Sequence, residues 1–263
     1  MQETLERTTA LPRLQLLGMP GPTLAGPDQV RCAQKPLVLL ARLLIEPRPV
    51  TREAMMAFLW PEVDEARARG SLRQALHVIR DIAGRDALAA DRQSVALVRP
   101  PVSDVHEFLS AVRRGDWQEA ALAYGGPLLD GVTIKDSLDA DLWIGLERRR
   151  LARLFETAAT TVLAASASLP ADDAHLVIAR RFRDLSPRSV RSWRYLLEAL
   201  ERKNATDDLC VERAALGARI DTGQIDDPEA AMVLLVGGGS PPVANGGHPS
   251  AAHVISTAAV VDV

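Results

Sequence analysis

The apolar positions between residues 66 and 84 recur with the period of an α-helix. At roughly 100° per residue, four of them fall on one narrow side, which is the pattern of a helix that buries a single face. These four residues are Leu72, Leu76, Ile79 and Ala83. The pattern therefore predicts one amphipathic helix with a core-facing stripe.

The other side of this predicted helix carries guanidinium and amide groups, and Asp81 is the only acid between residues 66 and 84. Arg67, Arg73, Gln74 and His77 lie opposite the apolar stripe, with Arg69 and Arg80 on its flanks. Such a side fits a DNA major groove, where Arg pairs with guanine, Gln pairs with adenine, and further cations hold phosphates. Arg73 and His77 are the best candidates for base contacts, whereas Arg67 and Arg69, at the helix start, suit phosphate. The alternative is a basic helix face that is simply solvated.

The elements before this helix read as short strands followed by two helices. Short apolar runs within residues 13–32, separated by Gly and Pro, predict at most a small sheet. Residues 34–46 are apolar on most sides and predict a buried helix that ends at the prolines after it. Thr51 is a suitable N-cap for a second helix, which Pro61 ends. Trp60, the last residue before Pro61, is expected in the core.

A β-hairpin follows the central helix, with its turn at residues 91–94. Strands, three helices and a hairpin in this order are typical of a winged helix, in which the third helix reads DNA and the hairpin is the wing. Arg92 at the wing tip suits the adjacent minor groove, although an exposed turn arginine is the equal alternative. Lys35 and Arg52, each at a helix start, are further candidates for phosphate contacts.

The second half of the chain predicts helices in pairs. Antiparallel pairs are expected near residues 104–124, 139–184 and 188–220, and their size and their aromatic and Ala positions favour tetratricopeptide-like repeats. A plain helical bundle is the alternative. After residue 236 the composition turns to Gly, Pro and Ser, which predicts a flexible linker and tail.

Long stretches of this sequence resemble SARP-type bacterial transcriptional activators. The OmpR-like winged helix of that family is similar to two stretches and the hairpin that follows them: KPLVLLARLLIEP and VTREAMMAFLWPEVDEARARGSLRQALHVIR. The family's bacterial transcriptional activator domain is similar to three later stretches: RRGDWQEAALAYGGPLLDGV, DADLWIGLERRRLARLFE and ARRFRDLSPRSVRSWRYLLEAL. The resemblance covers roughly residues 12–235, although residues 206–227 fit the last repeat poorly. It implies a winged helix that binds promoter DNA, often as tandem copies on direct repeats, and a helical domain for contacts and regulation.

The charge of the chain is unevenly distributed. The formal net charge is −3, which would argue against nucleic acid if it were evenly spread. The basic residues, however, exceed the acidic ones in residues 1–104 and concentrate in residues 66–85, which hold five Arg and one Asp. Local charge decides binding more than the total does, so the charge pattern also points to the central helix.

Catalytic and metal-binding patterns are missing from the sequence. Cys32 and Cys210 are far apart and form no CxxC, which excludes a zinc site by spacing and suits a reducing compartment; both are expected to be small core residues. The five histidines have no metal-ligand spacing, and no GxSxG or GxxxxGK[ST] pattern occurs. We therefore expect no enzyme activity, metal or cofactor. The amino terminus lacks signal-peptide features and no apolar run reaches 18 residues, so a cytoplasmic protein without a membrane contact is expected.

Together these patterns predict a mainly α fold with a small β component: a winged helix-turn-helix domain followed by an α-helical tetratricopeptide-like repeat domain. The expected divisions are a flexible N-terminus at 1–11, the winged helix at 12–102, the helical domain at 103–236 and a flexible tail at 237–263. The expected function is sequence-specific transcription regulation, as an activator, in the cytoplasm at the nucleoid. The expected partners are double-stranded promoter DNA and RNA polymerase, with a homodimer on tandem sites. The competing function is a protein-interaction adaptor whose winged helix no longer reads DNA.

Overall fold

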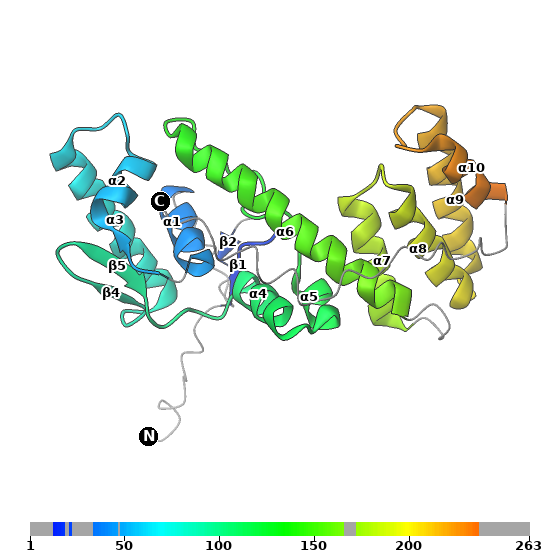
Figure 1. Cartoon of the computed structure of the whole chain (residues 1–263), viewed down its shortest axis with the longest axis horizontal. Helices are drawn as coiled ribbons and strands as arrows, with labels where there is room; N and C mark the ends of the chain where they lie inside the picture. The colour runs from blue at the N-terminus through cyan, green and yellow to red at the C-terminus, as the bar shows by residue number, and fades with distance from the viewer. Residues whose placement is uncertain (1–12, 19–20, 23–33, 47, 166–171, 237–263) are drawn as a thin grey trace, which may run out of the picture.

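The computed structural model describes residues 13–18, 21–22, 34–46, 48–165 and 172–236. In this part of the chain the fold is mainly α with a small β component, a winged helix followed by a helical domain (Figure 1). The predicted fold class is therefore confirmed. The predictions of a flexible N-terminus, of strands within 23–32, of a buried Cys32 and of a flexible tail after residue 236 concern residues outside the described ranges.

The winged helix contains three helices and a three-stranded antiparallel sheet. Strand β5 lies between β3 and β4, and the register pairs Val50 with Val95 and Leu88 with Leu97. The turn between β4 and β5 falls at residues 91–93, where the sequence predicts it. The elements are α1 (Gln34–Ile45), β3 (Val50–Thr51), α2 (Arg52–Leu59), α3 (Glu65–Ala83), β4 (Leu88–Ala90) and β5 (Ser94–Leu97).

The first two helices form where local sequence favours them. Helix α1 buries residues on nearly all sides, as its continuous apolar run predicts. Helix α2 begins after Thr51, whose hydroxyl accepts a hydrogen bond from the Ala54 amide at 3.2 Å. It ends at Leu59, two residues before Pro61. Trp60 is half-buried and packs against the core, in line with its expected place.

The helical domain is a stack in which each helix packs against the next one along the chain. The three expected pairs correspond to α4 with α5, α6 with α7, and α8 with α9, and α10 is an additional helix that the sequence patterns do not predict. Stacking of consecutive helices is also the arrangement expected of tetratricopeptide-like repeats. The helices are α4 (Asp104–Arg114), α5 (Trp117–Ala123), α6 (Leu138–Ala165), α7 (Asp173–Leu185), α8 (Val190–Arg202), α9 (Thr206–Asp221) and α10 (Pro228–Val236).

A column of aromatic rings joins the helices of this stack. Neighbouring ring centroids are 5.1, 4.7, 6.2 and 6.4 Å apart, within or near the range of favourable aromatic pairs. The rings, in order, are Phe108, Tyr124, Phe155, Phe182 and Tyr195. They come from α4, the end of α5, α6, α7 and α8, so the column fixes five successive segments in one core.

The short hairpin of β1 (Leu14–Gln15) and β2 (Gly21–Pro22) packs against the helical domain rather than extending the wing sheet. Leu14 donates its amide to the Val102 carbonyl at 2.9 Å. The buried carboxylate of Asp104, at the start of α4, accepts hydrogen bonds from the amides of Leu16 and Leu17, each at 2.9 Å. Burial raises the pKa of Asp104, while these amides oppose the rise. This segment thereby ties the chain before α1 to the chain after β5.

The winged helix and the helical domain share one continuous hydrophobic core. Ser137, just before α6, donates its hydroxyl to the Phe58 carbonyl at 2.5 Å. The Trp143 indole on α6 donates to Glu46 at 3.0 Å and meets the Phe58 ring edge-on at 5.9 Å. Helix α6 therefore holds the end of α2 in a defined position.

One prediction about single residues is wrong. Cys210 is exposed on α9 rather than buried. Helix α9 packs mainly against α8 and α10, its Asp208 and Glu212 pair with arginines of α7, and Leu216 is its one fully buried residue. Most positions of α9 therefore face solvent, including an apolar one such as Val211.

No helix among the described residues is long and apolar enough to cross a membrane.

Candidate nucleic-acid interface

The central helix of the winged domain, α3, is defined at both ends by local contacts. Asp64 is its N-cap and accepts the Arg67 amide at 3.0 Å. Gly84 ends it with φ = 100°, a conformation that glycine adopts at little cost, and donates its amide to the Arg80 carbonyl at 2.9 Å. The start lies one residue before the predicted one, so the sequence locates this helix closely.

The predicted apolar stripe is the buried face of α3. Leu72, Leu76, Ile79 and Ala83 are each at most 3% exposed. Ala68, Ala75 and Ile82 widen this face. Burial along the full length of the helix holds α3 rigidly against α1 and α2, so its opposite side is presented in a fixed orientation.

The six polar residues expected to face DNA lie on or beside the exposed side of α3. Arg67, Arg69, Arg73, Gln74 and His77 are exposed, and Arg80 is half-buried. The structure thus brings these six residues together on one surface of one helix. Their role in DNA binding remains a prediction.

Three of these side chains have acidic neighbours. Arg67 pairs with Asp64 at 3.2 Å and Arg69 pairs with Glu65 at 2.5 Å. His77 lies 3.7 Å from Asp81. The acids come from the helix start and from within the helix, so the basic surface is less positive than a count of arginines indicates.

The other three have no side-chain partner within the part of the chain that the structure describes. Arg73 and Gln74 are adjacent and exposed, and Arg80 lies two turns further along the Arg73 flank. Because no intramolecular ion pair has to be broken, the Arg73 guanidinium is available for a new contact. Its assignment from the sequence as a base-reading candidate stays a prediction.

The wing turn is held by hydrogen bonds that leave Arg92 exposed. The Asp91 carboxylate accepts the amides of Gln93 at 2.7 Å and Ser94 at 2.6 Å. These backbone hydrogen bonds, with that from Ser94 the largest cause, hold the pKa of Asp91 below its usual value. Arg52 donates its Nε to the Asp91 carbonyl at 2.8 Å. The structure therefore places Arg52 as a brace between α2 and the wing, and Arg92 at the tip of that braced turn.

Lys35 occupies a different environment from the residues of α3. Its ammonium pairs with Asp136 of the helical domain at 2.6 Å and lies 5.3 Å from the centre of the Trp60 ring. The hydrogen bond from Lys35 lowers the pKa of Asp136. Lys35 thus joins α1 to the segment before α6, and it is separated from the Arg73 side of α3.

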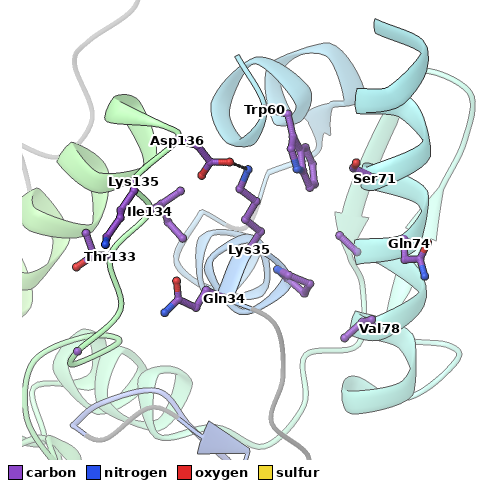
Figure 2. A pocket seen from close by; sticks show the side chains of 13 residues that line it. Gln34, Lys35, Trp60, Ser71, Gln74, Val78, Thr133, Ile134, Lys135 and Asp136 are labelled. Atoms are coloured by element: carbon purple, nitrogen blue, oxygen red, sulfur yellow. Dashed lines mark hydrogen bonds and ion pairs between the residues drawn. The ribbon is translucent and has the colours of Figure 1, made fainter. Parts of the chain in front are cut away.

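A cleft of about 930 Å³ opens between α1, α3 and residues 131–136 (Figure 2). Its lining includes Gln34, Lys35, Trp60, Ser71, Gln74, Thr133 and Lys135. Among these, Gln74 and Lys35 were singled out from the sequence, whereas Ser71, Thr133 and Lys135 were not. No periodic signal marks them, because the cleft arises only when segments a hundred residues apart come together.

Among the described residues no group of three or more His, Cys, Asp and Glu is placed to hold a metal ion.

No protein-family profile matches the sequence, and no curated protein matches it. Among solved structures, the chain is similar to EmbR of Mycobacterium tuberculosis in complex with a low affinity phosphopeptide. The two share 21% sequence identity with a TM-score of 0.48, and the match covers 85% of this chain and 63% of that one. The chain therefore spans less than two thirds of the EmbR chain.

Proposed function

We propose that this protein is a sequence-specific DNA-binding transcription regulator that acts as an activator, with α3 as the helix that enters the major groove of promoter DNA. The observation that carries the proposal is the division of α3 into a fully buried apolar face and an exposed face, on which Arg73 and Gln74 have no side-chain partner among the described residues. A rigid helix with unpaired Arg and Gln side chains suits direct reading of base edges. The resemblance of the sequence to SARP-type activators supports the same function.

The exposed residues take different roles in this proposal. Arg73 and His77 contact base edges and Gln74 suits adenine, since each presents donors toward the groove floor. Arg67, Arg69 and Arg80 contact phosphates, because most protein–DNA hydrogen bonds go to the backbone. Arg92 enters the neighbouring minor groove from the wing, and Arg52 fixes the wing and contacts phosphate from the start of α2. Lys35 is a further phosphate contact.

The helical domain serves protein contacts in this proposal. It binds RNA polymerase and brings two copies of the chain together on tandem sites, where linkage of two readers raises affinity without new base contacts. Ser137 and Trp143 attach it firmly to Phe58 of α2 and to Glu46 after α1, so that each DNA-reading helix of such a pair is held in a defined position on its own helical domain. The protein then works in the cytoplasm, at the nucleoid.

Selection from a random duplex pool tests the proposal. The full chain is expected to enrich one shared motif and to bind it at least about a thousandfold tighter than random duplexes at physiological salt. Binding to random DNA should weaken steeply as salt rises, since counterion release drives it. Recovery of no motif, together with no salt-dependent binding, would overturn the proposal and favour the protein-interaction adaptor.

A further inference from the structure

The cleft beside α3 has walls from both domains. One wall is a flank of α3 that includes Ser71, Ala75 and Val78. The opposite wall is the segment 131–136 that leads into α6, and the start of α1 lies between them (Figure 2). The cleft therefore runs alongside the helix that the proposed function places in a major groove.

The two flanks of α3 differ in charge. At roughly 100° per residue, Arg69, Arg73 and Arg80 fall on the flank away from the cleft. The part of the other flank that lines the cleft contains Ser71, Ala75 and Val78 but no cation, and Arg67 lies one turn before Ser71 on this side. The cations that line the cleft itself therefore come from neighbouring elements.

A helix seated in a major groove has a phosphate strand on each side, because the groove is only about 12 Å wide. The arginine-bearing flank neutralises one strand by itself. The strand on the other side passes Arg67 and runs along the cleft, where the cations that line it are Lys35 of α1 and Lys135 of the helical domain. Lys135 is exposed and has no ion-pair partner among the residues that the structure describes.

Lys35 is already engaged, although by a group that a phosphate can replace. Its ammonium pairs with Asp136, whose side chain is 66% exposed. The Lys35 side chain is 19% exposed, so it is the carboxylate side of the pair that faces solvent, where a phosphate oxygen can approach the ammonium and replace the carboxylate. The pair also spans the two domains, which means that a strand entering the cleft changes a contact between them.

We propose that the cleft holds the second phosphate strand of the bound duplex, with Lys135 as a phosphate contact from the helical domain and Lys35 as one that Asp136 restrains in the free protein. This inference rests on the proposed function, because it requires α3 to lie in a major groove. It makes the helical domain part of the DNA-binding surface. In addition, the Asp136 carboxylate then competes with a DNA phosphate for the Lys35 ammonium.

Two charge-changing variants of the full chain test this inference, each with a matched control at the far end of the helical domain. Lys135→Gln is compared with Arg191→Gln, and Asp136→Asn is compared with Asp221→Asn; both control positions are exposed. Affinity for random and for selected duplexes is measured across a salt series. A melting curve for each variant verifies that it is folded.

Lys135→Gln is expected to weaken binding to all duplexes alike and to reduce the salt slope by about 1. Asp136→Asn is expected to tighten binding to all duplexes alike, because it releases Lys35. Both controls should bind like the wild type. Wild-type affinity and slope in both cleft variants, while Arg73→Ala weakens binding, would overturn the inference and leave the proposed function standing. A wild-type chain that binds no duplex would instead overturn the proposed function.

Discussion

At the scale of single residues, the arginines of α3 differ in what they must release to reach a duplex. Arg67 and Arg69 leave Asp64 and Glu65, at a cost of no more than about 1 kcal/mol because exposed ion pairs are weak. Arg73 has no such partner among the described residues. Arg69 can exchange the Glu65 carboxylate for a DNA phosphate, which suits it to a contact with the DNA backbone. Arg73 is not held by a carboxylate, so its guanidinium can adopt the more restricted geometry of a hydrogen bond to a base edge.

Asp104 is the buried charge on which the junction of the two domains depends. Its oxygens accept the amides of Leu16, Leu17 and Val105. Asp104→Asn replaces one acceptor with an NH₂ group that faces donors, so we expect the free energy of unfolding to fall by about 1–3 kcal/mol. Denaturant unfolding measures this, with exposed Asp221→Asn as the control. Equal free energies of unfolding for the two variants would show that the carboxylate of Asp104 does not stabilise the fold through these amides.

Some residue positions follow from the sequence and others do not. The Thr51 cap and the buried stripe of α3 depend on neighbours within one or two helical turns, so local pattern predicts them. The pairing of Lys35 with Asp136 joins residues 101 positions apart, and no local pattern contains that information. Cys210 was expected in the core because cysteine is usually buried, but α9 fully buries only Leu216 and leaves most of its other positions exposed.

At the scale of elements, periodicity predicts α3 well and α6 poorly. Helix α3 keeps one apolar stripe along its length. Helix α6 extends for 28 residues and exposes Leu138, Leu142 and Leu146, whose exposed fractions exceed one half. Apolar residues thus occur on both its buried and its exposed sides, so its sequence has no single apolar stripe that identifies the buried face. The sequence therefore predicts a helical pair here without its true length.

The aromatic column through α4 to α8 gives the helical domain a specific pH response. Burial, with a smaller contribution from Glu156, raises the pKa of Tyr124 from 10.0 to about 12. The unfolded chain therefore loses this proton first as pH rises above 10, so the stability linked to Tyr124 is present below pH 10 and is lost between pH 10 and about 12. Tyr124→Phe should show a shallower fall in the free energy of unfolding over this range. Parallel stability curves for variant and wild type would contradict the assignment.

At the scale of the whole molecule, the winged helix is docked on the helical domain rather than tethered to it. The shared core, the Ser137 and Trp143 hydrogen bonds and the ion pair of Lys35 all cross the junction. The predicted boundary at residues 102–103 falls where Leu14 and Leu16 bond to Val102 and Asp104. The sequence places this boundary from composition and resemblance, but it does not reveal how tightly the two sides are joined.

This junction predicts how the chain responds to dissection. A fragment that ends at Pro101 loses the partners of Leu14 and Leu16 and uncovers the Phe58 side of α2, so it should melt at a lower temperature than the full chain. It should also bind a tandem site more weakly, because it lacks the domain that links two readers. Calorimetry and binding to one-site and two-site duplexes measure both effects. Equal affinity of fragment and full chain for the tandem site would contradict a linking role.

Competition binding of Arg73→Ala and Arg69→Ala, against duplexes that vary one base pair of the selected motif at a time, shows directly whether α3 reads base pairs. We expect Arg73→Ala to lose about 1–3 kcal/mol of binding free energy on the preferred duplex and to relax the preference at one base position. Arg69→Ala should weaken every duplex to a similar extent. If both variants bind each duplex as the wild type does, α3 is not the element that reads DNA.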